Sequence, residues 1–238
     1  MEGNNQIKIK KELPIHIIGI SASGISELSL PIQKIIRSAK KLSAPKRILN
    51  SLKDWWTIQN SKDPFPDFFE SDKPNKLINW LKKHDQQIVV LASGDPLWFG
   101  IGRILLNNFP SERLVFHPSP TSLQLAFSRL GRPWQDASWI SLHGRDSSPL
   151  FKLLQKQPQT IGILTDPNKG GAKEVKDILD ASKLEKIYQF WICERLGHKD
   201  ERIFQISHKE IWPPLDPLHL VVLIKKKSTV DNSDDIPL

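Results

Sequence analysis

Short runs of apolar, mostly β-branched residues recur along the chain, with amphipathic stretches between them. The apolar runs predict buried strands at residues 15–20, 88–91, 114–117, 139–142, 160–164, 188–193, 201–206 and 218–224. The amphipathic stretches predict helices at residues 26–40, 74–84, 97–108, 121–130 and 171–179. Strands that alternate with helices are typical of an α/β fold with a largely parallel sheet. The closer spacing of strands toward the C-terminus predicts a second, mixed sheet.

The sequence HPSPTS at residues 117–122 interrupts this alternation. It predicts a boundary between an N-terminal α/β domain at residues 14–118 and a C-terminal α/β domain at residues 119–226. The polar stretches at residues 1–13 and 227–238 are expected to be flexible, because they hold too few apolar residues to pack against either domain.

The composition narrows the class of protein. With 238 residues, of which 39% are hydrophobic, the chain can bury a substantial core. The single cysteine, Cys193, excludes a disulfide framework and fits a reducing compartment. The N-terminus has no signal-peptide pattern, and the longest apolar runs are too short to cross a bilayer. We therefore expect a cytoplasmic protein that makes no membrane contact.

The formal net charge of +8 indicates an anionic partner. Nucleic acid and a small polycarboxylate would both satisfy this charge. Lysine and arginine are scattered along the chain rather than massed in one segment, so a solvated basic surface is a third explanation.

Turns of small or polar residues follow several predicted strands, at residues 19–24, 93–96, 118–122, 143–145 and 164–167. In open α/β sheets, ligands bind beyond the carboxyl ends of the strands. The turns therefore predict one cleft shared by the two sheets and lined by backbone and small side chains. For the first of these turns, at residues 19–24, a purely structural role is the alternative.

Several common chemistries do not fit the sequence. Gly19 and Gly24 have the spacing of a phosphate-binding loop, but Ile25 replaces the lysine that the loop requires. Ser21 stands where a dinucleotide-binding motif needs glycine. The histidines form no metal-ligand pattern, and no Gly-x-Ser-x-Gly nucleophile motif is present. Cys193 lies at the end of an apolar run and is expected to be buried and inert.

The stretch LASGDPLWFGIGRILL at residues 91–106 carries more small residues than a helix start needs. Asp95 and Pro96 predict a helix N-cap followed by a first-turn proline. A glycine inside a helix costs about 1 kcal/mol relative to alanine. The small residues of this stretch are Ser93, Gly94, Gly100 and Gly102. Their number suggests that a ligand lies close to this backbone.

These motifs together resemble those of the tetrapyrrole methylase family. The resemblance extends over about residues 14–224, and its most specific stretches are ASGDPLWFGIGRILL, SLQLAFSRLGRPWQDASWISLHGRD, GILTD, CERLGHKDERI and DPLHLVVLI. The second of these stretches is similar to the carbon-5 methyltransferases of cobalamin (vitamin B12) biosynthesis. The resemblance implies two α/β domains, S-adenosylmethionine (SAM) in a cleft between them, and a homodimer.

The resemblance also implies which residues bind the cofactor. By position these are Ser93, Gly94, Asp95 and Trp98 in one turn, Thr121 and Ser122 in a second, Leu164, Thr165 and Asp166 in a third, and Gly19, Ala22 and Gly24 in the first loop. The first loop departs from the family pattern Gly-Ile-Gly-Pro-Gly-Gly, because Ser21, Ala22 and Ser23 replace its second glycine, its proline and its third glycine. This change leaves room for reduced activity.

The implied reaction is methyl transfer from SAM, with S-adenosylhomocysteine as product, to carbon 5 of precorrin-6Y or cobalt-precorrin-7. Such a carbon is electron-rich and needs no dedicated general base, so we assign no catalytic acid or base. The substrate is a polycarboxylate, which arginine grips well. The candidate substrate contacts are Arg103, Arg132, His143 and Arg145.

Three alternatives remain open at this point. The chain could be a SAM-binding subunit without catalytic activity, a SAM methylase that acts on RNA or protein, or, more remotely, a nicotinamide oxidoreductase. Some relatives are fused to a second methyltransferase that decarboxylates the substrate and methylates carbon 15. The chain ends at Leu238, so we expect a separate partner protein to supply that activity.

Overall fold

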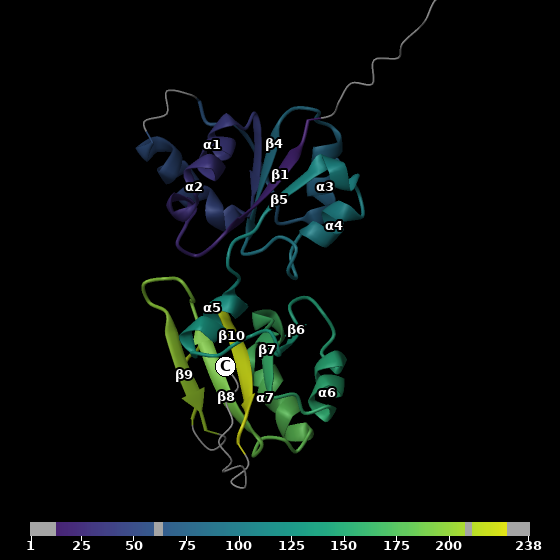
Figure 1. The fold of residues 1–238 in the computed structure, drawn as a ribbon, viewed down its shortest axis with the longest axis vertical. Helices are drawn as coiled ribbons and strands as arrows, with labels where there is room; N and C mark the ends of the chain where they lie inside the picture. The colour runs from purple at the N-terminus through teal and green to yellow at the C-terminus, as the bar shows by residue number, and fades with distance from the viewer. Residues whose placement is uncertain (1–12, 60–63, 208–210, 228–238) are drawn as a thin grey trace, which may run out of the picture. The chain divides into compact units, whose positions relative to one another are not determined.

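The computed structural model describes residues 13–59, 64–207 and 211–227, which fall into two compact units. The first unit extends to Thr121 and the second begins at Ser122. Each unit is an α/β structure built around one sheet (Figure 1). Among the described helices, none is long and apolar enough to cross a bilayer.

The described strands of the first unit form a parallel sheet in the order β3-β2-β4-β1-β5. The strands are β1 (Ile15–Ile20), β2 (Lys41–Ala44), β3 (Asp67–Glu70), β4 (Ile88–Ser93) and β5 (Leu114–His117). The central strands β1 and β4 are buried almost completely, as expected for a parallel sheet covered on both faces.

Helices cover both faces of this sheet (Figure 1). They are α1 (Leu30–Ser38), α2 (Lys46–Ile58), α3 (Pro74–Lys82) and α4 (Gly102–Leu106), with 3-10 turns at Ile25–Glu27 and Ser111–Arg113. One apolar cluster joins the sheet to α1 and α2, and a second joins it to α3 and α4. Both clusters use β1, whose alternate side chains point to opposite faces.

The described strands of the second unit form a mixed sheet in the order β6-β7-β10-β8-β9. The strands are β6 (Ser138–Ser141), β7 (Thr160–Leu164), β8 (Tyr188–Glu194), β9 (Arg202–Ile206) and β10 (His219–Lys225). The β6–β7 pair is parallel and the other pairs are antiparallel. The predicted α/β class, with a parallel sheet and a mixed sheet, is confirmed.

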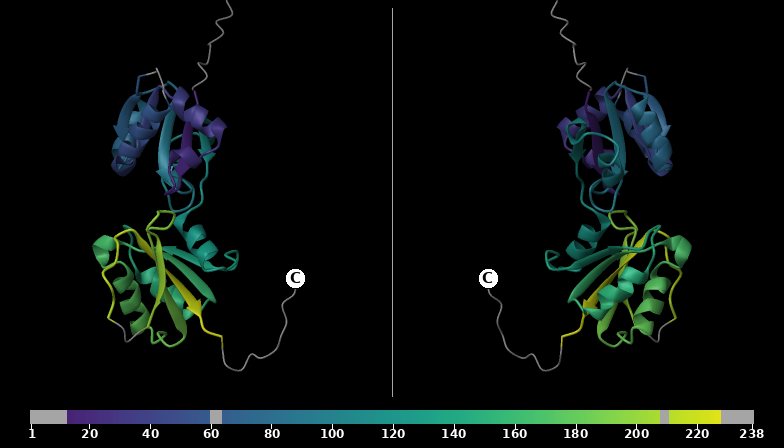
Figure 2. Two further views of the ribbon diagram at one scale, coloured as in Figure 1. Left: turned by 90° about the vertical axis from the view of Figure 1, so that its left-hand side faces the viewer. Right: turned by 90° about the vertical axis from the view of Figure 1, so that its right-hand side faces the viewer.

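Helices also cover both faces of the second sheet (Figure 2). They are α5 (Ser122–Arg129), α6 (Ser148–Gln155) and α7 (Ala172–Ala181), with a 3-10 turn at Pro167–Lys169. The helices α6 and α7 pack in one apolar cluster with the sheet, and α5 packs on the opposite face with Val222 and Cys193. Cys193 is buried as expected, and burial raises the pKa of its thiol to about 12.

The structure corrects several predicted elements. The strands β2 and β3 and the helices α2 and α6 were not predicted. The helix expected at 26–40 is a 3-10 turn followed by α1, because Pro31 starts the regular helix in its first turn. The helix expected at 97–108 begins only at Gly102, because the residues before it form a tight turn.

Candidate functional site

The turns after β1, β4 and β5 meet at one edge of the first sheet. The Gly94 amide donates to the Ile20 carbonyl (N···O 2.9 Å), and the Ser119 hydroxyl donates to the Gly19 carbonyl (3.0 Å). In the sheet register, Ile20 lies opposite Ser93. Parallel neighbouring strands end at the same edge, so three segments far apart in the sequence come together there.

Gly19 makes this convergence possible. A Cβ atom on Gly19 would lie 1.9 Å from the Gly94 oxygen and 2.8 Å from the Ser119 nitrogen. Gly94 has a positive φ of 59°, and a Cβ there would lie 3.2 Å from Thr121 Cα. Gly19 was predicted to contact the cofactor. In the structure, its lack of a side chain lets the turns after β1, β4 and β5 pack against each other.

Gly24 is the open glycine of the first loop. It has a φ of 90° and a ψ of −174°, a conformation that is nearly exclusive to glycine. A Cβ on Gly24 would meet no heavy atom within 4 Å, and the neighbouring Ala22 is exposed. This part of the loop leaves backbone accessible, as a cofactor-binding turn requires.

The segment after β4 is a tight turn rather than the start of a helix. The Asp95 carboxylate accepts the Leu97 amide (2.8 Å), and the Asp95 carbonyl accepts the Trp98 amide (3.1 Å). The Gly102 amide then closes the turn onto the Pro96 carbonyl (2.8 Å). The expectation that Asp95 and Pro96 begin a helix is therefore wrong.

The same turn explains the extra glycines. A Cβ on either Gly100 or Gly102 would lie 2.7 Å from the Pro96 oxygen. These two glycines are needed because the chain folds back on itself, and their presence does not require a ligand. The turn also exposes an apolar surface, in which the rings of Trp98 and Phe99 pack edge to face with their centroids 5.5 Å apart. Phe99 has a positive φ of 53°, which is rare for an aromatic residue.

Arg47 is a residue of this edge that the sequence analysis missed. It lies in the first turn of α2, and its guanidinium donates a hydrogen bond to the Ser93 hydroxyl. Both side chains are exposed. The signal that would have found Arg47 is the helical spacing of the apolar residues that follow it, which are Ile48, Leu52, Trp55 and Trp56.

Two turns of the second unit also lie together, after β6 and β7. The buried Asp166 carboxylate accepts the Gly144 amide (2.9 Å) with one oxygen and the Asn168 amide (3.0 Å) with the other. These hydrogen bonds, that from Gly144 first, lower the pKa of Asp166 from its ordinary value of 3.8. Thus the structure joins the HGR turn to the GILTD turn, with the aspartate as the link.

Thr165 and His219 hold the GILTD turn to the start of β10. The Thr165 hydroxyl donates to the His219 carbonyl (2.6 Å). The His219 ring accepts the Ala172 amide at Nε2 (2.9 Å), so its Nδ1 carries the proton and donates to the Asp216 carbonyl (2.5 Å). His219 therefore satisfies the first amide of α7.

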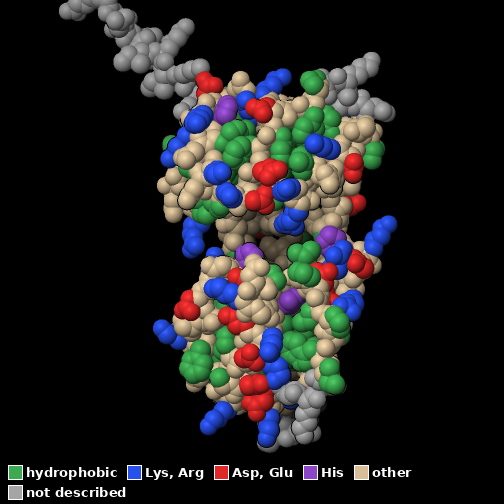
Figure 3. All heavy atoms as spheres, turned by 180° about the vertical axis from the view of Figure 1, so that it is seen from behind, with side chains coloured by type: hydrophobic (Ala, Val, Ile, Leu, Met, Phe, Trp, Pro, Cys, Tyr) green, Lys and Arg blue, Asp and Glu red, His purple; other side chains and the backbone are tan. Residues whose placement is uncertain are grey.

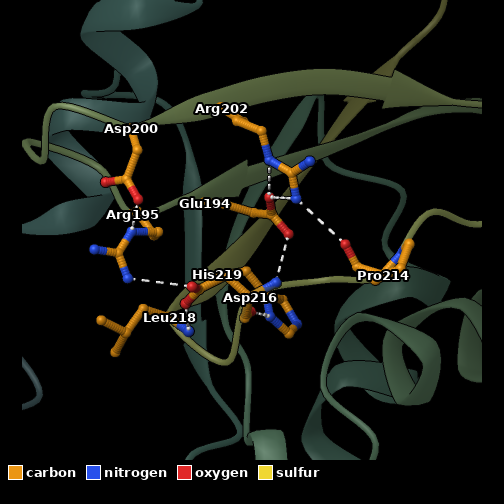
Figure 4. A network of polar contacts seen from close by, with 8 residues as sticks. All are labelled: Glu194, Arg195, Asp200, Arg202, Pro214, Asp216, Leu218 and His219. Atoms are coloured by element: carbon orange, nitrogen blue, oxygen red, sulfur yellow. Dashed lines mark hydrogen bonds and ion pairs between the residues drawn. The ribbon is translucent and has the colours of Figure 1, made fainter.

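The conspicuous CERLGHKDERI stretch builds a network of ion pairs (Figure 4). Glu194 is completely buried; it pairs with the Arg202 guanidinium (2.5 and 2.7 Å) and accepts the Asp216 amide (2.8 Å). Arg195 pairs with Asp200 (2.6 Å) and Asp216 (3.2 Å). The network anchors the segment just before β10. His219 is the first residue of that strand.

The remaining predicted residues are distributed over the two units. Leu164 ends β7, Ser122 begins α5, and Thr121 is buried next to Gly94. The candidate substrate residues that are exposed are Arg103 on α4, Arg132 after α5 and His143 after β6, whereas Arg145 is half-buried. His143 and Arg145 both lie in the turn after β6, on either side of Gly144 in the sequence.

Charged side chains of both signs are dispersed over each unit on the face drawn in Figure 3. In the described ranges, no three His, Cys, Asp or Glu side chains are arranged to hold a metal ion together.

Two curated relatives match most of the chain. It is 26% identical over 208 residues to the decarboxylating precorrin-6Y C(5,15)-methyltransferase of Sinorhizobium sp., covering 87% of this chain and 48% of that protein. It is also 26% identical over 202 residues to the probable cobalt-precorrin-7 C(5)-methyltransferase of Methanocaldococcus jannaschii, covering 83% of this chain and 90% of that protein. The chain thus spans about half the length of the first relative.

Solved structures share the fold. The methyltransferase CobJ superposes with a TM-score of 0.66 at 14% identity, over 90% of this chain and 94% of that one. A uroporphyrin-III C-methyltransferase from Thermus thermophilus, in complex with S-adenosylhomocysteine, superposes with a TM-score of 0.59 at 15% identity, over 88% of this chain and 96% of that one.

The family model for tetrapyrrole (corrin/porphyrin) methylases matches residues 14–211, which include β1 to β9 and the turns described above. The chain belongs to the tetrapyrrole methylase family.

Proposed function

We propose that the chain is a SAM-dependent methyltransferase that adds a methyl group to carbon 5 of precorrin-6Y or cobalt-precorrin-7. The observation that carries this proposal is the convergence of the turns after β1, β4 and β5, in a chain of the tetrapyrrole methylase family. The two relatives above, which are named for methylation at carbon 5, support the choice of reaction.

The turns of the first unit fit a cofactor that lies against backbone. Gly24 leaves open space beside its backbone, and Ser93 and Trp98 are exposed at the same group of turns. We assign cofactor binding to these turns and to the Leu164–Asp166 segment of the second unit. SAM would supply an electrophilic methyl group on its sulfonium, and the turns would orient that group toward the substrate.

The carboxylates of the candidate site hold the turns in shape. Both oxygens of Asp166 accept backbone amides, and Asp95 accepts the Leu97 amide. This arrangement suits a reaction in which the carbon nucleophile is already electron-rich and no side chain moves a proton. Correct positioning of two reacting groups alone can supply about 7–11 kcal/mol.

Basic side chains suit a polycarboxylate substrate, and Arg103, His143 and Arg145 lie in or next to the turns after β4 and β6. We assign contacts with its acidic groups to Arg103, Arg132, His143 and Arg145. Arginine binds a carboxylate through two parallel hydrogen bonds, which fixes the orientation of the macrocycle as well as its affinity.

The reaction is tested by incubating the chain with SAM and either precorrin-6Y or cobalt-precorrin-7. The expected product gains one methyl group by mass spectrometry, and NMR with a ¹³C-methyl donor places the label on carbon 5. A label on another carbon contradicts the proposed position. Binding of SAM without turnover of either tetrapyrrole favours a non-catalytic subunit, for which the altered Gly19–Gly24 loop is the motivating observation.

A further inference from the structure

Arg47 places a positive charge at the edge where the turns of the first unit meet. It lies in the first turn of α2, which follows β2, and β2 pairs in parallel with β4. The first turn of α2 and the end of β4 are therefore on the same edge of the sheet. The hydrogen bond from the Arg47 guanidinium to the Ser93 hydroxyl fixes the side chain at that edge.

No acidic side chain among the described residues forms an ion pair with Arg47. Other arginines of the chain do have such partners, as Arg129 has Glu201 (2.6 Å) and Arg202 has Glu194. Near the start of α2, the Asp72 carboxylate accepts the Lys46 amide (2.8 Å).

The unused hydrogen-bonding capacity of Arg47 is large. A guanidinium carries several N–H donors in a planar fork that matches a carboxylate, and the Ser93 hydroxyl engages one of them. The side chain is exposed, so a ligand can reach the remaining donors.

We propose that Arg47 binds a carboxylate of a ligand at the candidate site, an inference that rests on the proposed function. Two sources offer this chemistry. One is the carboxylate at the methionine end of SAM, and the other is an acidic side chain of the tetrapyrrole. Ser93 orients the guanidinium, and Arg47 contributes binding and orientation without proton transfer.

The test compares the unmodified chain with Arg47→Ala, Arg47→Lys and the control Arg37→Ala. Arg37 lies in the last turn of α1, just before β2 begins, and hence at the opposite edge of the sheet. Calorimetry with S-adenosylhomocysteine measures cofactor affinity, and steady-state kinetics with cobalt-precorrin-7 measure KM and kcat. The melting temperature of each variant checks that it is folded.

Because Arg47→Ala removes a charge-assisted hydrogen bond, we expect it to weaken binding of the ligand about tenfold to a hundredfold. A rise in the dissociation constant of S-adenosylhomocysteine identifies the SAM carboxylate, whereas a rise in KM for the tetrapyrrole alone identifies its acidic side chain. Arg47→Lys should restore part of the loss, because it keeps the charge without the fork. Arg37→Ala should leave both constants unchanged.

Equal constants for Arg47→Ala and the unmodified chain, for both ligands, overturn the assignment of Arg47. This outcome differs from failure of the proposed function. In that case the unmodified chain itself neither binds S-adenosylhomocysteine nor methylates the tetrapyrrole, and Arg47 loses its proposed role together with the reaction.

Discussion

The backbone amide of Gly144 donates a hydrogen bond of 2.9 Å to the Asp166 carboxylate, and this contact joins the turn after β6 to the turn after β7. The two strands are parallel neighbours, so both turns lie at the same sheet edge. In the first unit, the Gly94 amide donates to the Ile20 carbonyl and so joins the turns after β4 and β1. Each unit therefore fixes its own group of turns through hydrogen bonds that backbone amides donate.

Replacement of Asp166 by Asn should loosen the turns of the second unit. The amide keeps one acceptor oxygen, so either the Gly144 or the Asn168 amide loses its buried partner. We expect a lower melting temperature for Asp166→Asn. The control is Asp180→Asn, which removes an exposed ion pair with Lys176 on α7 and should change the melting temperature little. Equal melting temperatures for the two variants would contradict this role of Asp166.

Alanine at Gly19 should disrupt the first unit. Its Cβ would clash with the Gly94 carbonyl, and overpacking of this kind costs about 1–3 kcal/mol or more. The control is Gly131→Ala, where φ is 60° but a Cβ meets no atom within 4 Å. That variant should lose about 1–2 kcal/mol from backbone strain alone.

Urea denaturation measures both losses, and calorimetry with S-adenosylhomocysteine separates them further. Gly19→Ala should also lose cofactor binding, and Gly131→Ala should keep it. A Gly19→Ala protein as stable as the unmodified chain would show that the turns do not need this close approach.

The stability of the first unit should fall as the pH decreases below about 6.5. The rings of His16 and His117 stack with their centroids 5.3 Å apart. The distance between His16 Nδ1 and His117 Nε2 is 3.1 Å. Burial, and for His16 also the charge of His117, lowers both pKa values from 6.5. The unfolded chain therefore binds protons first as the pH falls, and the stability is lost between 6.5 and the lower pKa of the folded state.

The measurement is urea denaturation between about pH 8 and pH 5. His117→Gln should reduce the dependence on pH, because it removes one of the two histidines and its charge. The control is His143→Gln, at an exposed position of the second unit. An unchanged pH dependence in His117→Gln would contradict the assignment to this pair.

Removal of the Glu194 charge should destabilise the second unit. Glu194 is completely buried and receives hydrogen bonds from Arg202 and the Asp216 amide. Because hydrogen bonds to charged groups contribute about 1.5–3 kcal/mol, Glu194→Gln should lower the free energy of unfolding by about that amount. The control Glu112→Gln, at an exposed position, should stay close to the unmodified chain. Similar values for the two variants would show that the network adds little stability.

The strongly apolar strands could be predicted from the sequence, and the short polar ones could not. β1 was predicted with the bounds that the structure shows, since IHIIGI is nearly all apolar and buried. β2 holds only four residues, of which Lys41 and Ser43 are polar. Its pairing with β3 and β4 makes it a strand, and a local pattern does not reveal such a partner.

The positions of the turns at the candidate site could be predicted from the sequence, but the contacts between them could not. Small residues after each strand indicated where the turns lie, because ligands bind at those ends. The sequence could not show that Gly19 packs against Gly94, or that Asp95 closes a turn instead of a helix, because both depend on backbone geometry. Arg47 was missed because α2 was not predicted.

Hydrogen–deuterium exchange of the unmodified chain, with and without S-adenosylhomocysteine, tests most directly whether the turns at the strand ends form the cofactor site. The proposed cofactor site predicts slower exchange at residues 19–24, 93–98 and 119–122 and at residues 164–166 when the ligand is added. Binding of S-adenosylhomocysteine with slower exchange only in other segments, or no binding at all, would contradict it.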